Sequence, residues 1–210
     1  MDSVSFDQPP ARADAPLDST VSQGLKIVIV GGFGVGKTTM VRSVSEIRPL
    51  DTEATMTNVG VGVDDPIGAP GKSTTTVAFD FGRITLDAEN VLYLFGAPGQ
   101  ERFWFLWDRL FGGALGAIVL VDPRRITDCW YAIDRLEHQG TRFVVACNDF
   151  GGQIFHPDEI REALDLDPQV PLLDCDARSR NSCKRVLITL VEHLHTAARN
   201  AAARIPETAS

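Results

Sequence analysis

Residues 31–38 constrain the fold of this chain more than any other segment. Their sequence, Gly-Gly-Phe-Gly-Val-Gly-Lys-Thr, fits the phosphate-binding pattern G-x-x-x-x-G-K-[ST]. An apolar, β-branched run at residues 25–30 precedes them and is typical of a buried strand. Residues 39–47 follow, with apolar side chains near helical spacing. Strand, glycine loop and helix in this order are the context in which the pattern holds a nucleotide's phosphates.

The chemistry of the loop follows from its residue types. Glycines let consecutive backbone N–H groups surround a phosphate without Cβ clashes, and the helix N-terminus adds the positive end of a dipole. Lys37 is predicted to reach the β- and γ-phosphates and the Thr38 hydroxyl to ligate Mg²⁺. The plainer alternative is a glycine-rich turn with a solvated lysine. The predicted phosphate-binding residues are Gly31, Gly34, Val35, Gly36, Lys37, Thr38 and Thr39.

Length and composition indicate one globular domain with two tails. The chain has 210 residues, of which 44% are hydrophobic and 23% charged, enough to bury a sizeable core. We expect a disordered tail at residues 1–24, a domain at 25–199 and a C-terminal tail at 200–210. A net charge of −8, without any Lys/Arg-rich block, argues against a general nucleic-acid-binding protein.

The lack of targeting signals in the sequence, together with the cysteine spacing, favours a cytoplasmic protein without its own membrane anchor. The sequence has no apolar run long enough to span a bilayer, no secretory signal in residues 1–24 and no lipidation motif at either end. The four cysteines form no C-x-x-C pair, so buried reduced thiols are favoured over a zinc site or disulfides.

Alternating strand and helix patterns predict an α/β fold: a three-layer, doubly wound, mostly parallel six-stranded sheet with its ligand at the carboxyl ends of the strands. The second and third predicted strands, 74–86 and 91–95, are close enough to form a hairpin. Residues 48–73 are rich in proline and glycine and are predicted to be a long loop. The other predicted strands are 25–30, 117–121, 143–147 and 170–174, and the predicted helices are 39–47, 101–112, 126–139, 157–166 and 182–199.

Three further segments occupy positions that matter in GTPases. Residues 96–101, Gly-Ala-Pro-Gly-Gln-Glu, follow the third predicted strand, Asn148 follows the fifth, and residues 176–178 follow the sixth. Over residues 25–199 the chain therefore resembles small Ras-like P-loop GTPases. Residues 74–83 and 97–100 are most similar to the bacterial MglA-like branch, in particular to actinobacterial conservon ATP/GTP-binding proteins.

This resemblance implies a regulatory switch that binds GTP or GDP with Mg²⁺ and hydrolyses GTP slowly. A roadblock-type protein would read the switch, sometimes beside a sensor-kinase-like protein, and any recruitment to a membrane would come from a partner. Thr76 would join the Mg²⁺ when a γ-phosphate is present, with Thr74 and Thr75 as alternatives. The remaining implied residues are Gln100, which would orient the attacking water beside Lys37, Gly99 in the same loop, Asn148 facing the base, and Ala177, whose N–H would meet the guanine carbonyl.

Asp80 is an acid inside an otherwise apolar strand, which is costly unless it is paired or near a metal. Gly96 stands where most small GTPases carry an aspartate that supports Mg²⁺. The MglA-like branch also lacks that aspartate and keeps an acid at the position of Asp80. We therefore expect Asp80 to support the Mg²⁺ shell through water; the alternative is a solvent-facing charge on an edge strand.

Two departures from the family pattern leave a second function open. Thr75 occupies the position of the branch's arginine finger, so hydrolysis should be slow unless Arg83, Arg102 or a partner supplies one. Gly151 replaces the aspartate that recognises guanine, which weakens the choice of GTP over ATP, although Asp149 lies nearby. The alternative function is a nucleotide-binding scaffold with little or no hydrolysis.

An aromatic segment follows the second predicted switch. One helix cannot easily bury all of its side chains against its own sheet, so some are expected to anchor a partner and about half to pack in the core. The segment comprises Phe103, Trp104, Phe105, Leu106, Trp107, Leu110 and Phe111.

Overall fold

The computed structural model describes residues 19–48, 50–57, 74–152 and 155–203, and these build one seven-stranded sheet with helices on both faces. The strands are β1 (Gln23–Val30), β2 (Leu50–Thr57), β3 (Thr74–Thr85), β4 (Asn90–Gly96), β5 (Gly116–Val121), β6 (Phe143–Asn148) and β7 (Leu172–Cys175). The α-helices are α1 (Lys37–Val44), α2 (Trp107–Phe111), α3 (Trp130–His138), α4 (Pro157–Ala163) and α5 (Arg180–Ala203), and two 3₁₀ segments, η1 (Glu101–Leu106) and η2 (Pro123–Cys129), precede α2 and α3.

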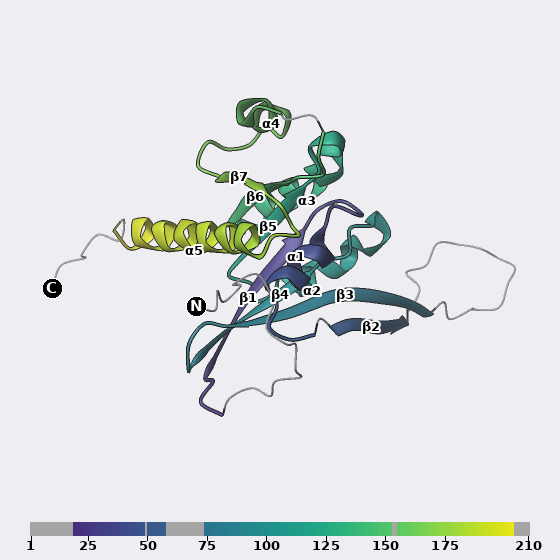
Figure 1. Ribbon diagram of the computed structural model, residues 1–210, viewed down its shortest axis with the longest axis vertical. Coiled ribbons are helices and arrows are strands. Elements are labelled where there is room, and N and C mark those ends of the chain that lie inside the picture. Colours follow the sequence, from purple (N-terminus) through teal and green to yellow (C-terminus); the bar gives the residue numbers. More distant parts are fainter. Residues whose placement is uncertain (1–18, 49, 58–73, 153–154, 204–210) are drawn as a thin grey trace, which may run out of the picture.

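The strand order is β2-β3-β4-β1-β5-β6-β7, which places β1 in the middle of the sheet (Figure 1). Strand β1 is parallel to both β4 and β5, and the order of the chain reverses on its two sides. In doubly wound sheets, a crevice for ligands opens at the carboxyl end of the strand where this reversal occurs. The glycine loop follows β1 directly and therefore lies at that crevice.

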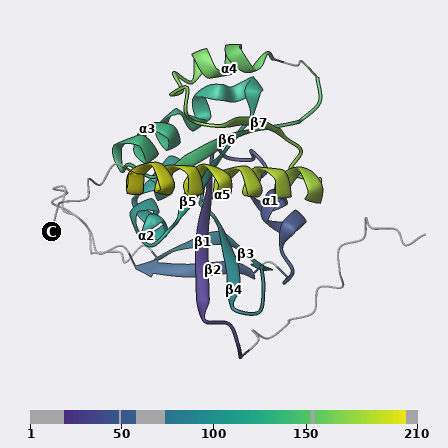
Figure 2. The same cartoon turned by 90° about the vertical axis from the view of Figure 1, so that its left-hand side faces the viewer.

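Two apolar clusters fill the spaces on the two faces of the sheet. One joins α1 and α5 to the strands, and Figure 2 shows α5 lying across that face. The other joins α2, α3 and α4 to the opposite face. Strands β5 and β6 are buried along their whole length because both faces are covered, which explains their continuous apolar sequences. Within the described part of the chain, no helix is long and apolar enough to cross a bilayer.

The α/β doubly wound, mostly parallel architecture is confirmed, but the sheet has seven strands where six were expected. All six predicted strands are present, and β3 and β4 form the expected antiparallel hairpin. The additional strand, β2, lies inside the segment predicted to be a loop and pairs with β3 from Leu50↔Phe81 to Thr57↔Thr74. Its sequence, Leu-Asp-Thr-Glu-Ala-Thr-Met-Thr, has little apolar character, so pairing with β3 defines it and hydrophobic periodicity does not.

The segment boundaries also differ in places. The predicted helix at 101–112 is a 3₁₀ segment followed by a short α-helix, and the predicted helix at 126–139 likewise begins as η2. Strand β1 starts at Gln23, inside the predicted N-terminal tail, and α5 continues to Ala203. The rest of the predicted tails, 1–18 and 204–210, lies outside the described residues.

The aromatic segment is mainly core. Phe103, Leu106, Trp107 and Phe111 are all buried, which agrees with the expectation that about half of the segment packs in the core. Trp104 is partly exposed and stacks on Tyr131, with ring centroids 3.5 Å apart. Leu110 is also partly exposed, and the side chain of Phe105 lies outside the described residues. Phe103 and Leu106 of η1 pack with Phe79, whereas Trp107 and Phe111 of α2 join the apolar cluster formed with α3 and α4.

We expect Trp107→Ala to lower the free energy of unfolding by about 3–5 kcal/mol, because a buried indole leaves a large cavity. Trp107 is 2% exposed, and its indole N–H donates to the Pro98 carbonyl at 3.2 Å. Denaturant unfolding would measure the change. Trp130→Ala is the matched control, since Trp130 is 52% exposed and should cost much less. Equal losses for the two variants would contradict the assignment of Trp107 to the core.

Candidate functional site

The glycine loop is pressed against the end of a neighbouring strand. Gly31 has φ 140°, and a Cβ at this residue would lie 2.2 Å from the Leu120 carbonyl oxygen in β5. Only glycine tolerates both the conformation and the contact. The loop then passes into α1, which begins at Lys37. Its backbone N–H groups and the N-terminus of α1 therefore face the crevice at the carboxyl end of β1.

Lys37 is held inside this loop. Its side chain is buried, and its Nζ donates hydrogen bonds to the carbonyl oxygens of Gly31 at 2.9 Å and Gly32 at 2.7 Å. Burial lowers the pKa of Lys37 to about 8, and the negative charge of Asp80 acts in the opposite direction. The ammonium group is thus fixed beside the loop, and its contact with phosphates stays a prediction.

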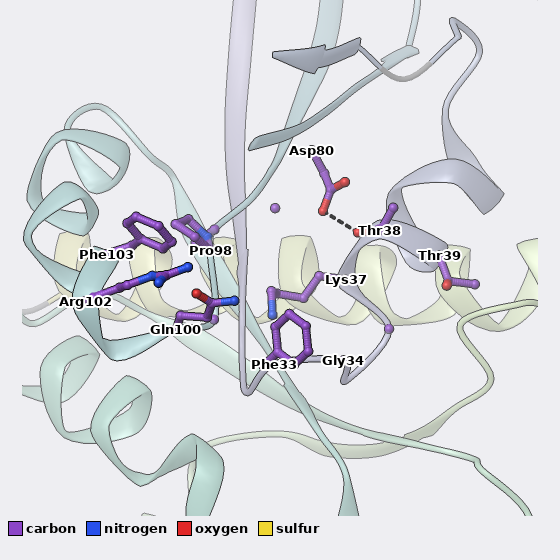
Figure 3. A pocket seen from close by; sticks show the side chains of 14 residues that line it. Phe33, Gly34, Lys37, Thr38, Thr39, Asp80, Pro98, Gln100, Arg102 and Phe103 are labelled. Atoms are coloured by element: carbon purple, nitrogen blue, oxygen red, sulfur yellow. Dashed lines mark hydrogen bonds between the residues drawn. The ribbon is translucent and has the colours of Figure 1, made fainter. Parts of the chain in front are cut away.

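Asp80 reaches the loop from β3. The Thr38 hydroxyl donates to Asp80 Oδ2 at 2.7 Å (Figure 3). Asp80 is paired with Gly96 of β4 in the sheet, and a Cβ on Gly96 would lie 2.8 Å from Asp80 Oδ2 and 2.9 Å from its Cβ. The absence of a side chain at Gly96 therefore leaves the room that the carboxylate occupies. The alternative of a solvent-facing acid on an edge strand is wrong, because β2 covers the other side of β3.

The pair Thr38 and Asp80 fits the predicted Mg²⁺ site in its chemistry. A hydroxyl and a carboxylate are hard oxygen donors, and Mg²⁺ at nucleotide sites takes one or two protein oxygens with the rest from phosphates and water. Across the described residues, no group of three or more His, Cys, Asp or Glu side chains could hold a metal by itself. Thr76, the third predicted ligand, lies in β3 opposite Thr55 of β2, and its side chain is outside the described residues.

The second predicted switch closes the opposite wall of the same crevice. A Cβ on Gly99 would lie 2.7 Å from the Gly31 carbonyl oxygen, so this loop touches the glycine loop backbone to backbone. Figure 3 shows Gln100 and Arg102 on this wall, facing Lys37 and Thr38 across the pocket. The pocket has a volume of about 550 Å³. Besides these residues it is lined by Phe33, Gly34, Gly36, Thr39, Asp80, Gly96, Ala97, Pro98, Gly99 and Phe103.

The predicted base-recognition residues have a different arrangement from the one expected. The buried Asn148 amide donates to the Val35 carbonyl at 3.0 Å, and its Oδ1 accepts the Ala177 backbone N–H at 2.9 Å. The expectation that this N–H is directed at a guanine carbonyl is therefore wrong for this structure, because Asn148 already uses it. Asn148 joins the glycine loop to the loop after β7. The Asp149 carboxylate accepts the Gly151 N–H at 2.7 Å and so is turned onto its own loop.

An ion-pair cluster that the sequence reasoning missed supports the glycine loop from outside. Asp122 directly follows β5, is buried, and pairs with Arg124 at 2.8 Å and Arg125 at 3.3 Å. Hydrogen bonding from Arg124 lowers the pKa of Asp122 to about 2. Arg125 in turn donates to the Phe33 carbonyl at 3.0 Å. The available signal was the sequence Asp-Pro-Arg-Arg at the carboxyl end of a buried strand, where ligand-side residues gather in such sheets.

Comparison with known families agrees with this geometry. A family model described as a conserved hypothetical ATP-binding protein matches residues 29–197, which include the glycine loop, Asp80, Gln100 and Asn148. The chain belongs to this family. The ATP-binding family and the P-loop structure together identify a nucleotide-binding protein.

Solved structures with the same fold are G domains. The FeoB G domain of Methanococcus jannaschii has a TM-score of 0.54 at 13% identity and covers 83% of this chain and 99% of its own. The G domain of the T. maritima FeoB iron transporter has a TM-score of 0.57 at 17% identity and covers 81% of this chain and 99% of its own. At 13% and 17% identity, the similarity to these two structures establishes the fold of this chain, which is that of P-loop GTPases.

A sequence relative from Methanocaldococcus jannaschii, the uncharacterized protein MJ1339, is 29% identical over 101 residues. The match spans 48% of this chain and 53% of that relative, about half of its length.

We expect the affinity of this protein for a nucleoside triphosphate analogue to fall as the pH rises above about 8. Deprotonation of Lys37, whose pKa is lowered to about 8, removes the charge that the phosphates need. One proton limits the loss to about tenfold per pH unit. Equilibrium binding between pH 7.5 and 9.5 would measure it. Lys37→Met should bind weakly across this range without the slope; a slope that persists in this variant would contradict the assignment.

Proposed function

We propose that this protein is a nucleotide-dependent regulatory switch that binds GTP with Mg²⁺ and hydrolyses it slowly. Three features of one pocket support the proposal: the glycine loop with Lys37, the pair Thr38 and Asp80, and Gln100 on the opposite wall. The glycine loop with Lys37 suits a triphosphate, and the pair suits a divalent cation. Gln100 suits the orientation of the attacking water. A simple phosphate-binding turn has no need for the other two.

The hydrogen bond between Thr38 and Asp80 is the single observation that carries the proposal. It connects the nucleotide pocket to β3, the strand that also pairs with β2 at the edge of the sheet. A ligand that changes this contact therefore acts on β3 directly. Changes in the β2–β3 region would then be read by a partner, for which a roadblock-type protein, beside a sensor-kinase-like protein, is our candidate.

The chain's own residues would divide the work as follows. Backbone N–H groups of the glycine loop and Lys37 hold the phosphates. Thr38, Asp80 and, in the triphosphate state, Thr76 hold Mg²⁺, which neutralises phosphate charge when it is bound. Gln100 orients the attacking water by accepting and donating hydrogen bonds through its amide. Gly99 keeps this glutamine against the glycine loop because it permits the close backbone contact.

A second function is favoured by the base-recognition end of the site. Gly151 provides no carboxylate for guanine, and Asp149 is turned onto its own loop at 2.7 Å from the Gly151 nitrogen. The family description also names ATP. The alternative is therefore a nucleotide-binding scaffold with relaxed choice between GTP and ATP and little hydrolysis.

One experiment separates the two functions. Purified protein is incubated with Mg²⁺ and either GTP or ATP, and both the bound nucleotide and the released phosphate are measured over time. Preferential GTP binding with slow phosphate release would support the switch. Similar affinity for both nucleotides without phosphate release would support the scaffold and overturn the proposed hydrolysis.

We expect Asp80→Ala to weaken Mg²⁺-dependent nucleotide binding by about 10–100-fold, the usual effect of losing a group that supports a metal shell. Titration of a fluorescent nucleotide with and without Mg²⁺ would measure it. Asp134→Ala on α3 is the control, since Asp134 is exposed and does not line the pocket. Loss of affinity that is equal in the presence and absence of Mg²⁺ would exclude a metal-linked role for Asp80.

A further inference from the structure

In the transition state of phosphoryl transfer, negative charge is spread over the transferred group and the leaving oxygen, and an arginine directed at that charge accelerates the reaction by about 10³–10⁵-fold. Thr75 stands where the MglA-like branch that the sequence resembles carries an arginine, so another side chain must supply the charge if the proposed intrinsic hydrolysis is to be accelerated in this way. The following inference rests on that proposed function. The candidates are Arg83 on β3, Arg125 in η2 and Arg102 in η1.

Arg83 does not meet this requirement. It is 7% exposed, lies three residues beyond Asp80 on β3, and does not line the nucleotide pocket. Its backbone N–H donates to the Ser45 hydroxyl at 3.2 Å, next to the end of α1. Side chains an odd number of residues apart on a strand point to opposite faces, so Arg83 is directed away from the face that carries Asp80.

Arg125 is close to the glycine loop but is already engaged. It pairs with Asp122 at 3.3 Å and Asp128 at 3.4 Å, and it donates to the Phe33 carbonyl at 3.0 Å. It does not line the nucleotide pocket. These contacts make it a support for the loop from outside, with its charge balanced by two carboxylates.

Arg102 is the arginine that lines the pocket. It is exposed, follows Gln100 by two residues, and extends toward the centre of the pocket on the same wall as Gln100 (Figure 3). Its guanidinium carbon lies 4.7 Å from the centroid of the Phe103 ring, which is itself buried. A cation placed over a fixed aromatic ring keeps its orientation while its N–H groups remain available for an anion.

The turn that carries Arg102 is tied to Gln100. The Phe103 backbone N–H donates to the Gln100 carbonyl at 2.9 Å, at the start of η1. The water-orienting residue and the arginine therefore belong to one hydrogen-bonded turn. A movement of this turn brings both groups to the phosphates or removes both.

We propose that Arg102 is a catalytic residue of the intrinsic hydrolysis, acting as an arginine finger from the same chain. Water attacks the γ-phosphorus, the bond from this phosphorus to the β–γ bridging oxygen breaks, and the proton of the water passes to the released phosphate. The Arg102 guanidinium donates hydrogen bonds to the oxygens of the transferred group and to the β–γ bridging oxygen, which gains negative charge as its bond to phosphorus breaks, and the guanidinium is unchanged at the end.

The test compares Arg102→Ala and Arg102→Lys with wild type and with Arg109→Ala, an exposed arginine on α2 that does not line the pocket. Single-turnover phosphate release from GTP and from ATP is measured at saturating Mg²⁺. We expect Arg102→Ala to be slower by at least about 10²-fold. Arg102→Lys should recover only part of the rate, because an ammonium cannot form the two-pronged contact. Arg109→Ala should hydrolyse at the wild-type rate.

A second readout does not depend on turnover. Aluminium fluoride imitates the transferred phosphoryl group. Binding of a fluorescent nucleoside diphosphate in the presence of Mg²⁺ and aluminium fluoride should be lost in Arg102→Ala. Binding of the diphosphate alone should remain within about threefold of wild type, since an interaction made only in the transition state does not contribute to ground-state affinity.

The outcomes distinguish this inference from the proposed function. If Arg102→Ala releases phosphate at the wild-type rate and keeps its fluoride-dependent binding, the role of Arg102 is overturned and the proposed function stands. Arg102→Ala that loses diphosphate affinity without slowing hydrolysis also overturns it, because Arg102 would then only hold the nucleotide. Absence of phosphate release from wild type with either nucleotide overturns the proposed hydrolysis and the arginine's role together.

Discussion

The site depends on a backbone-to-backbone contact made possible by two glycines. Gly31 lies against the Leu120 carbonyl of β5, where a Cβ would approach to 2.2 Å, and Gly99 lies against the Gly31 carbonyl, where a Cβ would approach to 2.7 Å. Three chain segments therefore meet without intervening side chains. This places the phosphate-binding loop, the loop with Gln100 and the end of a central strand around one pocket. Close packing of this kind leaves no slack, so a shift of one segment is transmitted to the others.

The presence of an acid at Asp80 on β3 and of a glycine at Gly96 on β4 decides which strand contacts Thr38. A carboxylate at position 96, the last residue of β4, would directly precede the loop that carries Gln100. Here the acid comes from β3, in register with Gly96, and reaches Thr38 at 2.7 Å. The contact between the nucleotide pocket and the sheet edge is thus direct, and it comes from a different strand than the one that leads into the loop with Gln100 and Arg102. Asp80, proposed to support Mg²⁺, and Gln100, proposed to orient water, therefore lie on different elements.

Sequence reasoning succeeded where a residue's place in the fold follows from its own segment and failed where a partner segment decides it. The position of Lys37 and Thr38 at the start of α1 was predictable because spacing within one loop and helix fixes it. Strand β2 was missed because Leu50–Thr57 has no alternating apolar pattern and gains its hydrogen bonds only from β3. The Ala177 N–H was assigned to a base because its tie to Asn148, 29 residues earlier, leaves no local signal. Which members of the aromatic segment are buried could not be read from the sequence, because η1 and α2 place them in different apolar clusters.

The sequence by itself determined the α/β class, the glycine loop with its strand and helix, and the expectation that Asp80 needs a partner. Each of these rests on local spacing or on the cost of burying a charge, which are properties of the chain alone. Only the tertiary structure decided that the partner is the Thr38 hydroxyl, that Gly96 makes room for the acid, and that Arg102 rather than Arg83 lines the pocket. These outcomes depend on strand register and on which face of a strand or turn a side chain occupies, and contacts between distant segments set both.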